Sequence, residues 1–171
     1  MESVSMSIKQ HINDNGYSAR VNDIAEMNHL FTKVGFPENG ELGEATKKGS
    51  GHEATETMSE IITVAAVHEF GAPARNIPER SFIRTSFDDN FTALQEFKKM
   101  QAALVIQGKQ SAMTGIRKIG EWLTNKTKAR INSNIPPKLA DKTIARKHSS
   151  RALIDTAQMI NSVQHVEEYV K

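Results

Sequence analysis

The chain has 171 residues, of which 38% are hydrophobic and 25% charged, so it is long enough for one domain with a real core and too short for two. It contains no cysteine, which excludes disulfides and thiolate zinc sites and suits a reducing compartment. No apolar run approaches the roughly 20 residues that span a bilayer, and no secretory leader opens the sequence, so we expect cytoplasmic synthesis and no membrane partner.

The formal net charge of +2 conceals an uneven distribution along the chain. Residues 117–151 hold ten basic and two acidic side chains, a net charge of +8, whereas the remainder has a net charge of −6. A chain polarised in this way can bind copies of itself, bind an acidic partner or turn its basic side toward DNA, although a solvated basic helix has the same composition. The candidate basic patch consists of Lys126, Lys128, Arg130, Lys142, Arg146, Lys147 and Arg151.

The first third of the chain predicts an arm, a short helix, a strand and a loop. Apolar residues within 1–16 fit both strand and helix spacing, so we interpret this segment as an N-terminal arm or an edge strand. Asn22 is a fair N-cap for a short amphipathic helix that ends before a strand at Phe31–Phe36. Residues 37–57 are rich in glycine and charge and poor in large apolar residues, which predicts a flexible loop.

The next stretch predicts a core helix joined to a core strand by a stiff loop. An apolar run ends at Gly71, and glycine is the usual residue just beyond a helix. Pro73 and Pro78 hold the following residues extended. The alternation in Ser81–Arg84 predicts a strand with Phe82 pointing inward. A stiff exposed loop of this kind is either a docking element or an ordinary connection.

Two helices are predicted in the middle of the chain. Ser86 and Asp89 fit a capping pair for the first of them. The core side of this helix consists of Phe87, Phe91, Leu94 and Phe97. The second, longer helix runs from Ser111 to Asn132. Its apolar seam consists of Met113, Ile116, Gly120, Leu123, Thr127 and Ile131.

The longer helix carries two residues with a specific expectation. Gly120 would let another helix approach closely, and Trp122 either covers the edge of the sheet or faces a neighbouring subunit. The segment Asn134–Pro137 ends the helix because two prolines cannot continue it. A basic loop over 138–151 and a short turn then lead to a final strand through Tyr169.

These elements together predict a single α+β domain over 1–171. In this fold a small, mostly antiparallel sheet packs against two long helices, with a flexible glycine-rich loop and extended arms. No internal repeat interrupts this organisation.

No constellation in the sequence has the spacing of an active site. His52-Glu53 and His68-Glu69 each lack the second histidine, one turn on, that a zinc-binding helix needs. Lys47–Gly51 has the wrong order for a phosphate loop, and no serine lies in the glycine-flanked turn that a nucleophile needs. We therefore expect no catalytic, metal or cofactor site and no enzymatic activity, whereas a hydrolase would lose its activity with His68.

Several segments, taken in order, resemble one family of viral structural proteins. They are VAAVHEFGAP at 64–73, IPERSFIR at 77–84 and PPKLADKTIARKHSSRALIDTAQMINSV at 136–163. Their order and spacing resemble the tail-completion or virion-morphogenesis proteins of long-tailed double-stranded DNA phages, with a likeness that extends over 30–170.

The chain departs from the pattern of that family at three positions. It has Ser81 and Ala152 where the family has proline, and Ala157 where the family has glycine. The last departure is the most consequential, because a glycine supplies a turn that this chain is then expected to make differently.

The resemblance implies a structural virion protein of the phage neck, assembled in the host cytoplasm as a homo-oligomeric ring. A hexamer would match the symmetry of the tail. The implied partners are copies of the chain itself, the connector or adaptor of the head, and the tail terminator or tail tube, with non-specific contact to packaged DNA through the basic patch. A tail terminator is the alternative within this class, and a small basic nucleic-acid-binding regulator is the alternative of another class.

The loop after the core helix supplies the candidate interface with subunits or partners. Its residues are Glu69, Phe70, Pro78, Glu79, Arg80 and Arg84. The two glutamates place negative charge on a rigid loop, where basic residues of a neighbouring copy could meet them. Arg80 or Arg84 could equally neutralise these acids within the same chain, so both interpretations stay open.

Overall fold

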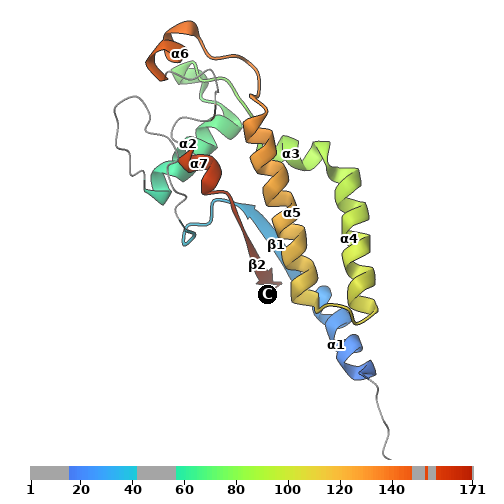
Figure 1. Cartoon of the computed structure of the whole chain (residues 1–171). Coiled ribbons are helices and arrows are strands. Elements are labelled where there is room, and N and C mark those ends of the chain that lie inside the picture. The colour runs from blue at the N-terminus through green and yellow to red at the C-terminus, as the bar shows by residue number, and fades with distance from the viewer. Residues whose placement is uncertain (1–15, 42–56, 148–152, 154–156, 171) are drawn as a thin grey trace, which may run out of the picture.

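The computed structural model describes residues 16–41, 57–147, 153 and 157–170 (Figure 1). Within these residues the fold is α+β, rich in helix and with one small antiparallel sheet, as the sequence predicts. The predicted arm at 1–16 lies outside the described residues except for Gly16, and so does the predicted loop at 37–57 except for residues 37–41 and 57.

Two segments from opposite ends of the chain pair to form the sheet. β1 (Leu30–Gly35) runs antiparallel to β2 (Gln164–Tyr169), and the register places Leu30 opposite Tyr169. The two strands confirm the predictions of a strand in the first third of the chain and of a final strand through Tyr169. The sheet therefore joins the beginning and the end of the described chain (Figure 1).

The longest helix lies beside this sheet and holds the fold together. α5 (Ala112–Asn132) packs against both strands, and α4 (Phe91–Ile106) packs against α5 (Figure 1). The Ser111 hydroxyl accepts a 3.2 Å hydrogen bond from the Thr114 N–H, which caps α5 at the predicted residue. One long helix, rather than two, thus makes the extensive contact with the sheet in the described part of the chain.

The prediction that Gly120 lets another helix approach α5 is wrong, because the element that approaches α5 closely at this glycine is the sheet. A Cβ atom at this position would lie 2.5 Å from the Thr32 Oγ1 and 2.8 Å from the His165 Cγ. These distances are far below van der Waals contact, so only glycine fits without a shift of the Thr32 and His165 side chains.

Trp122 connects α5 to α4. Its ring stacks on Phe97 with centroids 5.7 Å apart and an interplanar angle of 17°, and the Lys126 ammonium lies 5.1 Å from its centroid. The expectation that Trp122 covers the sheet edge is therefore wrong, because the helix turns this side chain toward its helical neighbour. Stacked rings with a cation over one face contribute to the α4–α5 contact.

The helix that precedes the sheet starts earlier than predicted. α1 (Tyr17–Met27) begins after Gly16, which has a φ of 76°, and not at Asn22. No residue of α1 is buried, and the helix leans on α4, α5 and β1 at the lower end of the molecule (Figure 1). The Tyr169 hydroxyl donates a 2.5 Å hydrogen bond to Glu26, which ties α1 to the end of β2.

A second group of elements lies beyond the other end of the sheet. It contains α2 (Met58–Phe70), the short 3-10 helix η1 (Pro73–Arg75), α6 (Asp141–Lys147) and α7 (Gln158–Asn161) (Figure 1). α2 ends before Gly71 as predicted, and α6 lies where the sequence suggested only a basic loop.

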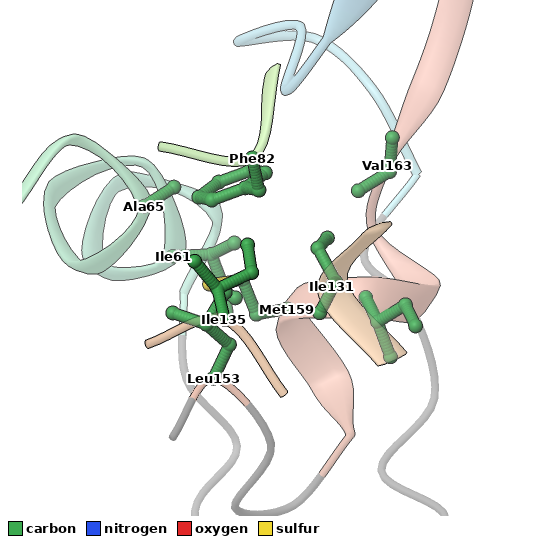
Figure 2. Packing of buried hydrophobic residues seen from close by; sticks show 9 residues of the cluster. Ile61, Ala65, Phe82, Ile131, Ile135, Leu153, Met159 and Val163 are labelled. Carbon is green, nitrogen blue, oxygen red and sulfur yellow. The ribbon is translucent and has the colours of Figure 1, made fainter. Parts of the chain in front are cut away.

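Figure 2 shows the hydrophobic cluster that packs this group together. It draws on α2, the end of α5, α7 and the segments between them, so residues distant in sequence meet in one place. The cluster consists of Ile61, Ala65, Phe82, Ile131, Ile135, Leu153, Met159, Ile160 and Val163. Phe82 is fully buried, which confirms that it points inward.

The segment around Phe82 is nevertheless a helix start and not a strand. α3 (Ile83–Asp89) begins immediately after it, and Asn90 separates α3 from α4. Ser86 and Asp89 do not form the predicted cap. The Ser86 hydroxyl is instead buried in α3, 3.0 Å from the Thr127 hydroxyl of α5.

None of the described helices is long and apolar enough to cross a membrane.

Candidate functional site

The Glu69 carboxylate organises the loop that the sequence singled out. It accepts hydrogen bonds from the Ser81 hydroxyl at 2.7 Å and from the N–H groups of Phe82, Ile83 and Arg84 at 2.7, 2.9 and 3.0 Å. These N–H groups belong to the first turn of α3, where the helix itself offers them no acceptor. Glu69, which is 5% exposed, therefore caps α3 from the end of another helix.

The backbone between the two helices brings the cap into place. A Thr57–Glu60 capping box starts α2, and Gly71 ends it with a φ of 73°. A Cβ atom on Gly71 would lie 2.8 Å from the Glu79 N, so the returning chain passes directly over this residue. The Arg80 N–H then donates to the His68 carbonyl at 2.7 Å, which places the start of α3 on the end of α2.

The hydrogen bonds set the charge state of Glu69. Burial by itself raises the pKa of this carboxyl, but the donors from Ile83, Ser81, Phe82 and Arg84 favour the ionised form more strongly. The net result is a pKa below the ordinary value of a glutamate. Glu69 is thus a buried carboxylate whose negative charge is stabilised by four hydrogen bonds from its own chain.

Arg80 connects the segment before α3 to the segment that follows α5. Its Nε and Nη2 both donate to the Pro137 carbonyl, at 3.1 and 2.8 Å, and the residue is 4% exposed. Burial lowers the pKa of the guanidinium. The bond pair joins the IPERSFIR segment to the PPKL segment, 57 residues apart. We call Glu69, Arg80 and the groups they bind the clamp.

The clamp decides between the two interpretations that the sequence left open. Glu69 is satisfied within its own chain, and the expectation that it offers a charge to a neighbouring copy is wrong because its carboxylate is buried. Glu79 forms an ion pair with Arg84, so the second acid is also neutralised internally, in solvent-exposed surroundings. Four interface candidates stay exposed on this loop: the ion-paired Glu79 and Arg84, and the uncharged Phe70, at 70%, and Pro78.

The basic patch is only partly a free surface. Lys126 lies over Trp122, and Arg130 donates to the Thr85 hydroxyl at 3.2 Å and lies 3.6 Å from the Asp89 carboxylate. Lys128 is half-buried on α5, and Lys142 is exposed on α6. Arg146 and Lys147 lie in α6, but their side chains and the whole of Arg151 fall outside the described residues.

Sequence reasoning missed the charges on the sheet. The Lys33 ammonium of β1 lies 2.8 Å from the Glu168 carboxylate of β2 and 5.3 Å from the centroid of the Phe31 ring. On the other face, the His165 Nδ1 lies 2.7 Å from the Glu167 carboxylate. The lysine in one strand and the two adjacent glutamates in the other were the available signal, but pairing partners 135 residues apart cannot be read from one sequence.

The described residues contain no group of three or more histidine, cysteine or acidic side chains placed to hold a metal ion. No protein-family model matches the chain, and no curated protein or solved structure matches it either. The functional argument therefore depends on the geometry of the clamp, the core and the sheet.

Proposed function

We propose that this protein is a structural subunit of the neck of a long-tailed double-stranded DNA phage. In this proposal identical copies form a hexameric ring that joins the head connector to the tail. The protein acts by shape: it provides a rigid wall element and contacts to the proteins above and below it.

The observation that carries the proposal is the convergence of the resembling segments. Glu69 of the HEFG segment holds the start of the SFIR helix, and Arg80 of the IPER segment holds the carbonyl of Pro137 in the PPKL segment. Leu153 and Met159 of the LIDTAQM segment enter the same core cluster. Segments that form the clamp and its core would be retained together in order, which supports a common architecture with the resembled family.

Ala157 adds independent support at the position where the family has glycine. The residue has a φ of 64°, a left-handed conformation that glycine adopts freely and alanine adopts at a cost. Alanine at this position therefore has a backbone conformation that is typical of glycine. A backbone suited to the residue of the family is what a shared fold would leave behind.

A rigid clamp suits a structural protein, whose role is to hold its partner proteins in fixed positions. Four donors on one carboxylate and two on one carbonyl fix the angle between α2, α3 and the segment after α5. The exposed Phe70 and Pro78 lie on this fixed corner, where a partner protein would meet a surface of constant shape. Lys142 on α6 remains available to packaged DNA or to an acidic neighbour.

Deleting the gene from the phage that encodes it tests this proposal. The expected products are filled heads and finished tails of normal length that fail to join, and a plasmid copy of the gene restores joining. Tails of abnormal length would instead support the tail-terminator alternative. Normal yields of infectious particles without the protein would refute a structural role in the neck.

The regulator alternative predicts a different result with the purified protein. It requires tight DNA binding by the isolated chain, with an affinity that falls steeply as the salt concentration rises. The neck proposal requires no such binding. Lys126 and Arg130, which a regulator would use for phosphate contacts, are engaged within the chain.

A further inference from the structure

The two-stranded sheet has an open edge on each side within the described residues. β1 pairs with β2 and with no other described strand, and β2 pairs only with β1 there. A strand edge presents unpaired N–H and C=O groups, which form a template for another strand. An isolated two-stranded ribbon is also marginally stable on its own.

The hydrogen-bond pattern shows which groups face outward. The Val170 N–H donates to the His29 carbonyl at 2.7 Å, so His29 and Val170 form a hydrogen-bonded pair at the end of the ladder. Pairs alternate along an antiparallel ladder, so the next position, Leu30 opposite Tyr169, points its backbone groups away from the partner strand. The same holds for the pairs Thr32–Glu167 and Val34–His165.

The two edges carry opposite charge. Lys33 is the charged residue of β1, whereas β2 carries Glu167 and Glu168. Pairing β2 with β2 of another copy would bring four carboxylates to one seam, and pairing β1 with β1 would bring two ammonium groups together. Both arrangements are disfavoured by like-charge contacts between neighbouring strands. Only β1 against β2 of another copy joins unlike charges.

We propose that β1 of each copy pairs through its outer edge with the outer edge of β2 in the next copy. This inference rests on the proposed ring and names the surface that closes it. An interface between different patches repeats from copy to copy, which generates a ring where the rotation closes. Lys33 and Glu168 lie on the sheet face opposite α5, so the outer face would carry alternating ammonium and carboxylate groups around the assembly.

The apolar exposure of β2 agrees with this occupant. Val166 on the outer face and Tyr169 and Val170 at the end of the strand are each more than one-third exposed. An added strand would cover part of this surface and pair the outward groups of Leu30, Thr32 and Val34 with backbone partners.

Charge reversal on the two edges tests the pairing. With Lys33→Glu alone, both β1 and β2 carry a glutamate at the proposed contact between copies. With Glu168→Lys alone, both strands carry a lysine there. Each variant should therefore need at least about tenfold higher concentration to assemble than the unmodified chain. An equimolar mixture should assemble normally, because each seam then joins one acidic and one basic residue in an alternating ring.

The mixture separates the contact between copies from the ion pair within each chain. Lys33–Glu168 is broken inside both variants, whether they are alone or mixed, so recovery on mixing can come only from contacts between chains. The double variant Lys33→Glu/Glu168→Lys restores both contacts and should assemble by itself. Native mass spectrometry gives the oligomer masses, and far-UV circular dichroism checks that each variant is folded.

The outcomes are each decisive for the edge-pairing proposal. Assembly of either single variant at the concentration of the unmodified chain, or no recovery in the mixture, would overturn it. An edge covered by residues 1–15 of the same chain, or by another neck protein, predicts this lack of recovery. If a reversed variant fails to fold, Lys33→Gln and Glu168→Gln replace the pair. Weaker assembly of each alone with partial recovery on mixing, because every second seam of the mixed ring joins Lys33 to Glu168, supports the proposal, and unchanged assembly or no recovery refutes it.

The same experiment distinguishes this inference from the proposed function. If the chain forms an oligomer whose stability does not depend on these charges, the edge-pairing proposal is refuted and the proposed role in the neck still stands. An unmodified chain that stays single up to its solubility limit removes the edge pairing, and the gene deletion then decides the neck role separately.

Discussion

The Glu69 carboxylate accepts a 2.7 Å hydrogen bond from the Phe82 N–H, thirteen residues further along the chain. The end of α2 therefore caps the start of α3, and the chain between these two helices passes back over Gly71. Phe82 is at the same time fully buried in the core cluster (Figure 2). One pair of residues thus fixes both the direction of α3 and the packing beneath it.

Replacement of Glu69 by glutamine should destabilise the fold. The amide keeps an acceptor but loses the charge and turns an NH₂ group toward N–H donors, so we expect a loss of about 2–3 kcal/mol in the free energy of unfolding. Urea titration at pH 7 measures this loss. Glu79→Gln, which breaks the exposed pair with Arg84, should cost less than about 1 kcal/mol. Equal costs for the two variants would contradict the clamp.

The cost of Glu69→Gln should also depend on pH. The folded pKa of Glu69 lies below the unfolded value of about 4.3, so its contribution is complete above that value and is lost as pH falls through the folded pKa. The difference in unfolding free energy between the natural chain and the variant should shrink below about pH 4. A difference that is constant from pH 7 to the acid limit would show that ionisation of Glu69 does not stabilise α3.

Arg80 predicts a distinction between lysine and arginine. Lysine retains the charge but cannot donate two hydrogen bonds in a fixed fork to the Pro137 carbonyl. Arg80→Lys should therefore cost about 1–3 kcal/mol, whereas Arg84→Lys at an exposed ion pair should change stability by less than about 0.5 kcal/mol. Thermal unfolding of both variants checks this order, and a harmless Arg80→Lys would contradict it.

Ala157 offers a stabilising substitution. Its φ of 64° is strained for alanine, so Ala157→Gly should raise the free energy of unfolding by about 1 kcal/mol. The matched change Ala103→Gly, on the exposed side of α4, should lower it by about 1 kcal/mol because helix interiors disfavour glycine. Destabilisation at both positions would show that residue 157 does not require a left-handed conformation.

A side chain at position 120 should destabilise the contact between α5 and the sheet. Gly120→Ala forces the Thr32 and His165 side chains away from α5, and we expect a cost of about 1–3 kcal/mol. Gly35→Ala is the control in β1, since a Cβ there meets no atom within 4 Å, and it should change stability little. The fluorescence of Trp122, the sole tryptophan, follows unfolding of both variants.

Local signals predicted much of the framework. Gly71 and Ser111 mark the end of α2 and the start of α5 because a helix end and an N-cap depend on near neighbours. The strand predicted at Ser81–Arg84 failed because four alternating residues are too few to separate a strand from a helix start. The deciding acceptor, Glu69, is distant in sequence and reaches this segment only through the fold.

The site was predicted in its residues but not in their roles. Glu69 and Arg80 were identified as charged groups on a rigid loop, and their burial turns them into internal supports instead of contacts for other chains. A carboxylate's partners are set by tertiary structure, so composition cannot distinguish an exposed acid from a buried cap. The sheet charges Lys33 and Glu168 were missed for the same reason, since strand pairing brings them together.

Antibody labelling of purified phage particles tests the central claim most directly. The account predicts that the label decorates the junction between head and tail in intact particles and is absent from the separate heads and tails made without this gene product. Absence of the protein from mature particles, or label confined to another part of the virion, would contradict its role as a neck subunit.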